Sequence, residues 1–178
     1  MRQPGSNFKP FIYSAALEQG FTAAKFVNDA PIVFDAPGLE SAWRPENYSG
    51  KYYGPTPLRK ALAHSRNLVS IRLLRAIGVN TAIEHVKRFG FDTARFPRNL
   101  SLSLGSGEVT PLELVSAYAV LANGGYRVDP YFIERIESED GDIVMRADPA
   151  RVCKGCAAIE YDEDNEPLDL ASIIEQAR

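Results

Sequence analysis

Helix-start and helix-stop residues recur along the first two thirds of this chain and constrain it to a largely helical fold. Proline is tolerated in the first turn of a helix, and glycine is favoured just past the last turn. Pro10, Pro57 and Pro111 are start signals of this kind, and Thr110 with Glu113 adds a capping box to the last of them. With the apolar stripes between them, these signals predict helices at 8–17, 57–62, 68–77, 81–89 and 111–122, with stops at Gly20, Gly78, Gly90 and Gly124.

Two further residues have the side chains of helix caps. Thr56 and Asn80 precede the second and fourth predicted helices, and threonine and asparagine side chains accept hydrogen bonds from free N–H groups at a helix start. Residues 21–54, by contrast, are interrupted repeatedly by proline and glycine. We expect this segment to be mostly irregular.

The last third of the chain carries a hairpin signal followed by a loop. A strand at 131–137, a tight turn at Asp140-Gly141 and a second strand at 143–145 predict a β-hairpin. Residues 150–169 are expected to form an acidic loop that contains the cysteines, and 168–176 has a helical pattern. The fold class predicted is α+β dominated by helices: a helical lobe plus a β-hairpin.

Composition excludes several classes of function. The chain has 178 residues, enough for one domain with a real core, and a net charge of −3. It shows no basic stripe interleaved with aromatic residues, so no nucleic-acid partner is expected. Its apolar runs are too short to span a bilayer, and no leader peptide is expected, because Met1-Arg2-Gln3 leads straight into a polar motif. That abrupt start suggests a chain that begins inside a larger domain.

The two cysteines form a Cys-x-x-Cys pair, Cys153 and Cys156. A thioredoxin-like redox site opens a helix within a βαβ unit, and no such pattern surrounds them. A zinc site needs two more ligands, and His64 and His85 are the only histidines. A small loop disulfide or two spectator thiols is expected instead, and no metal or cofactor is predicted.

Ser6 and Lys9 are three residues apart where a helix begins, which places a hydroxyl and an amine on one face. A serine hydroxyl is a poor nucleophile unless a base takes its proton, and a desolvated lysine can be that base. Free N–H groups at the helix start could stabilise a developing oxyanion. The competing interpretation is a helix cap followed by a solvated lysine.

Ser65 and Asn67 form a second candidate pair, in the short connection between two predicted helices. A hydroxyl there could pass a proton to a leaving amine, and a carboxamide could hold the substrate backbone or the lysine. A Ser-x-Asn sequence is also a common helix cap, and alone it would favour that structural role.

Together these motifs identify a family. Ser-x-x-Lys followed by a Ser-x-Asn motif is typical of penicillin-binding proteins and serine β-lactamases. Longer stretches resemble the transpeptidase domain of class A, bifunctional penicillin-binding proteins, and the resemblance covers nearly the whole chain. These stretches are Arg2 to Phe11, Trp43 to Tyr48, Gly54 to Leu62, Ser65 to Asn67, Leu102 to Ser106, Thr110 to Glu113, Ala117 to Ala119 and Ala122 to Gly125.

The resemblance implies a role for each motif residue. Ser6 matches the acylated nucleophile, and Lys9 matches its general base. Ser65 matches the serine that relays protons between the lysine and the leaving amine, and Asn67 matches the asparagine that contacts the substrate amide and the lysine. The implied fold is that of penicillin-binding and serine β-lactamase-like enzymes.

The implied reaction is D-alanyl-D-alanine transpeptidation of peptidoglycan stem peptides, with β-lactams as substrate mimics that leave a stable acyl-serine. The implied setting is the periplasmic face of a bacterial inner membrane, in a membrane-anchored protein that also carries a glycosyltransferase domain. None of these further parts is recognisable in the chain.

One family motif is missing. The chain contains no Lys-Thr-Gly or Lys-Ser-Gly sequence, and Lys154-Gly155 lacks the central hydroxyl residue. In the family that motif lies on a strand that supplies the second oxyanion N–H. Residues 1–178 are therefore expected to be a fragment of the transpeptidase domain, and weakly acylated or inactive alone.

Other functions share the first two motifs. A D,D-carboxypeptidase or a serine β-lactamase remains an alternative, although no glutamate that would activate a deacylating water is recognisable. A non-catalytic remnant or interaction module is the alternative from another class.

Overall fold

The computed structural model of the chain describes residues 1–34 and 42–150. These divide into two compact units, residues 1–132 and the part of the second unit up to residue 150. Cys153 and Cys156, the acidic loop from residue 151 on and the helical pattern at 168–176 lie outside the described residues. None of the helices in the described ranges is both long and apolar enough to cross a membrane.

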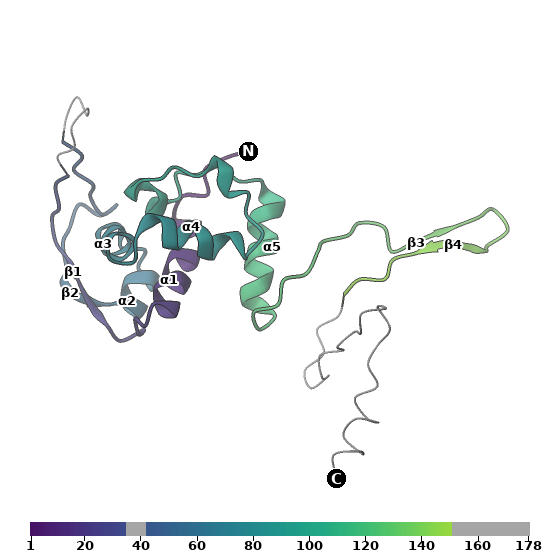
Figure 1. Cartoon of the computed structure of the whole chain (residues 1–178), viewed down its shortest axis with the longest axis horizontal. Helices are drawn as coiled ribbons and strands as arrows, with labels where there is room; N and C mark the ends of the chain where they lie inside the picture. The colour runs from purple at the N-terminus through teal and green to yellow at the C-terminus, as the bar shows by residue number, and fades with distance from the viewer. Residues whose placement is uncertain (35–41, 151–178) are drawn as a thin grey trace, which may run out of the picture. The chain divides into compact units, whose positions relative to one another are not determined.

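The first unit is built from helices (Figure 1). A 3-10 helix, η1, runs directly into α1, and all five helices predicted from the sequence are present, with ends shifted by a few residues. The bounds are Gly5–Phe8 for η1, Lys9–Glu18 for α1, Leu58–Ala63 for α2, Asn67–Ile77 for α3, Val79–Lys87 for α4 and Pro111–Ala122 for α5, with the short 3-10 helices η2 at Thr93–Arg95 and η3 at Leu100–Leu104.

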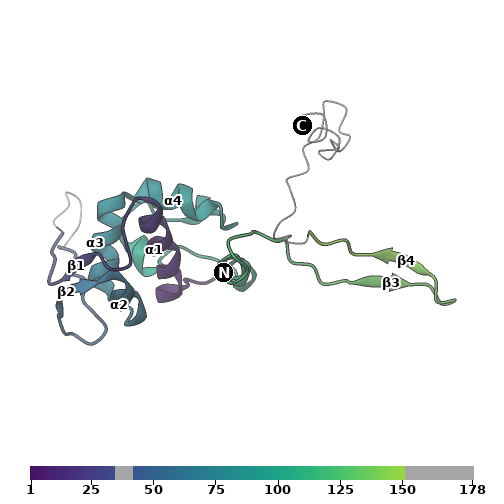
Figure 2. The same cartoon turned by 90° about the horizontal axis from the view of Figure 1, so that it is seen from below.

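Helix α1 lies at the centre of the first unit, against α2, α3 and α4 (Figures 1 and 2). Phe11, Ile12, Ala15 and Ala16 of this helix are buried, whereas Leu17 near its end is exposed. The aromatic rings of Phe8, Phe11, Phe91 and Phe96 pack edge-on or tilted against one another beside them. Burial of a large apolar side chain contributes about 1.5–3 kcal/mol. The start of α1 is therefore fixed by packing.

A two-stranded antiparallel sheet was not predicted. β1, Phe26–Asp29, pairs with β2, Gly54–Pro57, in the register that sets Asp29 opposite Gly54. Residues 21–54 were expected to be mostly irregular because proline and glycine recur along them. β2 itself contains glycine and two prolines, which are depleted in strands. Long-range pairing overrides that local preference.

Two predicted caps are wrong. Thr56 belongs to β2, where its hydroxyl donates to the carbonyl of Gly54, and α2 begins after Pro57 instead. Asn80 lies inside the first turn of α4, whose cap is Gly78, and its side chain accepts from Arg98. The capping box of Thr110 and Glu113 at α5 is confirmed.

The predicted hairpin is present in the second unit. β3, Arg135–Glu137, is shorter than expected and pairs with β4, Ile143–Arg146. Gly141, with a φ of +86°, lies in the turn between them. The fold is α+β with helices dominating, as predicted.

Candidate active site

Ser6 lies in the 3-10 turn that opens onto α1, with its side chain exposed. Pro10 lies in the first turn of α1, as the sequence predicted. Side chains three residues apart in a 3-10 helix lie one above the other, so Ser6 and Lys9 share a face. The backbone N–H groups at the start of this turn have no partner within the helix.

Close backbone contact holds this turn in place. The N–H of Gly5 donates to the carbonyl of Gly105 at 3.2 Å, and the Tyr118 hydroxyl donates to the carbonyl of Asn7 at 2.8 Å. A Cβ atom on Gly105 would lie 2.1 Å from the carbonyl oxygen of Gly5, so only glycine permits this approach. Gly105 and Tyr118 lie in family-like stretches, but the sequence alone gave neither of them a role.

Lys9 is completely buried, with 1% of its surface exposed. Its Nζ donates to the Ser65 carbonyl at 2.7 Å, to Ser65 Oγ at 2.9 Å and to Asn67 Oδ1 at 2.7 Å. The structure therefore brings three of the four predicted site residues into direct contact. The fourth, Ser6, makes no hydrogen bond to Nζ in the described part of the chain, although it precedes Lys9 by one turn.

Burial also changes the acidity of this amine. Desolvation lowers the pKa of Lys9 from 10.5 to about 8, because the interior disfavours the charged form. At pH 7 about a tenth of the side chain is then neutral, against well under a thousandth for a solvated lysine. A proton acceptor thus exists beside Ser6 near neutral pH.

Ser65 occupies a strained backbone position. Its φ is +52°, and it is the only non-glycine residue with positive φ in the described ranges. The N–H of Ser65 donates to the Leu62 carbonyl and that of Arg66 to the Ala61 carbonyl, which is the Schellman motif that ends a helix. Glycine is preferred at this point, and a serine costs about 1–2 kcal/mol. The left-handed turn points the Ser65 carbonyl and hydroxyl together at Lys9.

Asn67 is the first residue of α3, and two contacts fix its orientation. Its backbone N–H donates to Asn47 Oδ1 at 2.8 Å, and its side-chain Nδ2 donates to the Glu46 carbonyl at 2.8 Å. Because Nδ2 is committed to Glu46, Oδ1 must face Lys9. The sequence predicted Asn67 but not Asn47.

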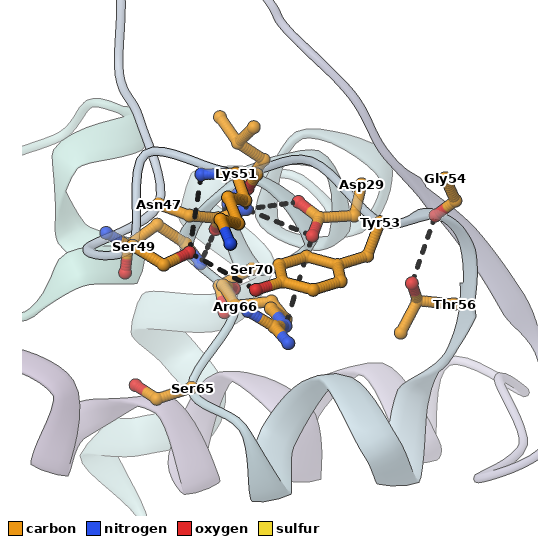
Figure 3. A network of polar contacts seen from close by, with 12 residues as sticks. Asp29, Asn47, Ser49, Lys51, Tyr53, Gly54, Thr56, Ser65, Arg66 and Ser70 are labelled. Carbon is orange, nitrogen blue, oxygen red and sulfur yellow. Dashed lines mark hydrogen bonds and ion pairs between the residues drawn. The ribbon is translucent and has the colours of Figure 1, made fainter.

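A buried polar network lies behind this turn (Figure 3). Asp29, at the end of β1, is completely buried and accepts from Asn47 Nδ2 at 2.8 and 3.0 Å. Arg66 approaches the same carboxylate at 4.0 Å, with its guanidinium 3.4 Å above the Tyr53 ring. The network ties the β1–β2 sheet to the Ser65–Asn67 turn.

The arrangement combines an exposed serine hydroxyl, a buried amine, a second hydroxyl and a carboxamide. This set of groups suits acyl transfer through a serine ester. Within residues 1–34 and 42–150, no cluster of histidine, cysteine, aspartate and glutamate could hold a metal ion.

Comparison with known proteins agrees with this chemistry. Residues 1–154 match the family described as the penicillin-binding protein transpeptidase domain. The chain is 58% identical over 151 residues to penicillin-binding protein 1A of Pseudomonas aeruginosa, covering 85% of the chain and 18% of that protein. It is 52% identical over 150 residues to penicillin-binding protein 1A of Neisseria cinerea, covering 84% of the chain and 19% of that protein. The chain thus spans about a fifth of the length of these curated relatives.

Two solved structures are similar to the chain. Penicillin-binding protein 1A from Haemophilus influenzae superposes with a TM-score of 0.80 at 40% identity, over 84% of the chain and 22% of that protein. PonA1 from Mycobacterium tuberculosis, solved in complex with penicillin V, superposes with a TM-score of 0.68 at 26% identity, over 82% of the chain and 41% of that protein.

Proposed function

This chain belongs to the penicillin-binding protein transpeptidase family, and we propose that it carries the nucleophile half of a D-alanyl-D-alanine transpeptidase site. Residues 1–178 are then a part of that domain. The observation that carries the proposal is the buried Lys9 amine, which lies one turn from Ser6 and hydrogen-bonds Ser65 and Asn67.

The first step is attack of Ser6 Oγ on the penultimate D-Ala carbonyl carbon of a stem peptide. The Ser6 hydroxyl proton passes to neutral Lys9 as the new C–O bond forms. The tetrahedral intermediate collapses when the C–N bond to the last D-Ala breaks, and the leaving nitrogen takes a proton from Lys9 through Ser65. An amine of a second stem peptide then attacks the acyl-serine carbonyl carbon: a C–N bond forms, the C–O bond to Ser6 breaks, and the proton lost by the amine passes to Ser6 Oγ through Lys9. The cross-link is then complete.

The hydrogen bonds of Lys9 explain why its protonation state controls this step. An ammonium has three N–H donors, and all three are used by the two Ser65 oxygens and Asn67 Oδ1. A neutral amine has two donors and a lone pair, so one of these contacts is released when the proton leaves. The freed lone pair can then accept from Ser6 or from the Ser65 hydroxyl.

The substrates and setting follow from the family. We infer that peptidoglycan stem peptides are the natural substrates and that β-lactams acylate Ser6, in keeping with the penicillin V complex of PonA1. The inferred place of action is the periplasmic face of the inner membrane, in a protein that also holds a glycosyltransferase domain and a membrane anchor.

A fluorescent penicillin tests the proposal. The experiment uses the protein as its own gene encodes it, which we call the encoded protein. We expect one acyl group per chain, on Ser6, and peptide mass spectrometry locates it. Ser6→Ala should abolish labelling, whereas Ser14→Ala, which removes another α1 hydroxyl, should retain it. Labelling that persists in Ser6→Ala would contradict the assignment, and rapid release of hydrolysed penicillin would indicate a β-lactamase.

The 178-residue polypeptide provides a second measurement. It contains no Lys-Thr-Gly sequence, and loss of one oxyanion donor typically costs about 100- to 1000-fold in rate. We expect this polypeptide to label more slowly than the encoded protein by that factor if the latter holds the third motif. Equal, brisk labelling would show that Ser6 and Lys9 act without it.

A further inference from the structure

Asn47 makes the hydrogen bond that places the backbone of Asn67. It is buried, with 5% of its surface exposed, in a segment that has no regular secondary structure. Its Oδ1 accepts from the backbone N–H of Asn67 at 2.8 Å and, more weakly, from that of Leu68 at 3.4 Å. These are orphan donors at the start of α3, so Asn47 caps this helix from a distant part of the chain.

The other half of the same amide is fixed by a charge. Asn47 Nδ2 donates to both oxygens of Asp29 and to the carbonyl of Lys51 at 2.9 Å. A carboxylate only accepts hydrogen bonds, so the amide cannot rotate by 180° without placing Oδ1 against Asp29. Asp29 thereby sets the orientation of Asn47 (Figure 3), and Asn47 sets the position of the Asn67 backbone.

Neighbouring contacts complete the path to the amine. The residue before Asn47, Glu46, accepts from Asn67 Nδ2 through its carbonyl, which turns Asn67 Oδ1 toward Lys9 Nζ at 2.7 Å. A continuous hydrogen-bonded chain therefore runs from Asp29 through Asn47 and Asn67 to Lys9. Hydrogen bonds to a charged acceptor are stronger than those between neutral groups, so the Asp29 end of this chain holds Asn47 firmly.

We propose that Asn47, oriented by Asp29, is a positioning residue for acylation: it fixes the Asn67 backbone so that the Asn67 carboxamide and the Ser65 turn meet Lys9. The proposal rests on the proposed function, because it assumes that Lys9 and Asn67 serve the reaction of Ser6. Asn47 touches no reacting atom and acts through Asn67.

Exchanging the donor and the acceptor between Asn47 and Asp29 tests the proposal in the encoded protein. Asn47→Asp keeps the oxygen that caps α3 but sets two carboxylates against each other, so the rate constant of acylation by fluorescent penicillin should fall at least about tenfold. Asp29→Asn leaves an acceptor for Asn47 and should cost less. The double variant Asp29→Asn with Asn47→Asp exchanges the donor and the acceptor and should recover part of the lost rate, because the Lys51 carbonyl still lacks its donor.

Controls separate positioning from loss of fold. Ser49→Ala removes an exposed hydrogen bond in the same segment and should leave the rate unchanged. Thermal unfolding of each variant gives the folded fraction at the assay temperature, and the rate is expressed per folded molecule. An Asn47→Asp rate equal to wild type, or a double variant no faster than Asn47→Asp, would overturn the proposal. Wild-type protein that is not labelled on Ser6 would instead refute the proposed function, which separates the two failures.

Discussion

The two turns that form the candidate site are held in different ways. The Ser6 turn runs directly into α1 and is exposed, and its hydrogen bonds to the rest of the chain go to backbone atoms and one tyrosine. The Ser65–Asn67 turn has a strained left-handed residue and depends on side chains from Asp29, Asn47 and Lys9. Ser6 is therefore placed by its own helix start and by close backbone contact with Gly105, whereas Ser65 and Asn67 are placed largely by side chains from distant parts of the chain.

Lys9 joins the two turns, and its removal should have the largest effect. Lys9→Met keeps most of the side-chain volume but deletes the proton acceptor, so acylation of Ser6 in the encoded protein should fall by about 10²- to 10⁴-fold. Lys25→Met, which removes an exposed lysine, should leave the rate unchanged. The second-order rate constant of labelling with fluorescent penicillin measures both.

The pH dependence of the acylation rate constant tests whether Lys9 acts as the base. In the proposed mechanism the neutral amine is the active form, and the pKa of Lys9 is lowered to about 8. Acylation should thus rise about tenfold per pH unit below that value and level off above it. Lys9→Met should flatten the profile between pH 6 and 9. A wild-type rate that is constant or falls over this range would exclude Lys9 as the base.

Gly105→Ala should break the Ser6 turn while leaving the Ser65 turn intact. The new Cβ would lie 2.1 Å from the Gly5 carbonyl oxygen, and the backbone must move to admit it. Gly20→Ala is the matched control, because Gly20 has a similar positive φ and no atom within 4 Å of its Cβ position.

Both substitutions cost about 1–2 kcal/mol for the left-handed backbone, and Gly105→Ala should cost a further 1–3 kcal/mol, roughly, for the overlap. Only Gly105→Ala should also slow acylation, since it displaces Ser6. Thermal unfolding and labelling rates test the pair. If Gly105→Ala and Gly20→Ala lose the same stability, the backbones of Gly5 and Gly105 are not in close contact.

The difference between the turns also explains what the sequence could and could not predict. The helix at Ser6 and Lys9 follows from Pro10, and the α5 cap follows from Thr110 and Glu113, because these signals act within a few residues of each other. The contact of Lys9 with Ser65 and Asn67 was expected from the family resemblance, and their roles in catalysis stay predictions.

The β1–β2 sheet and its polar network could not be predicted in the same way. Asp29, at the end of β1, and Asn47, in the segment before β2, are 18 residues apart and meet through a tertiary contact. Neither residue belongs to a local pattern that indicates burial. Residues that meet only through tertiary contacts leave neither a periodic pattern nor a motif of fixed spacing in a single sequence.

Ser65 gives the smallest effect and the most direct measure of how tertiary contacts maintain a strained turn. Ser65→Gly and Ser65→Ala both delete the hydroxyl that accepts from Lys9, so both should slow acylation to the same extent. Glycine adopts the left-handed conformation without strain, whereas alanine does not. The free energy of unfolding of Ser65→Gly should therefore be about 1 kcal/mol higher than that of Ser65→Ala. Denaturant titration of the two variants gives this difference. If they are equally stable, the turn is not strained; if Ser65→Gly is the more stable, the left-handed turn stores strain that the surrounding tertiary contacts maintain.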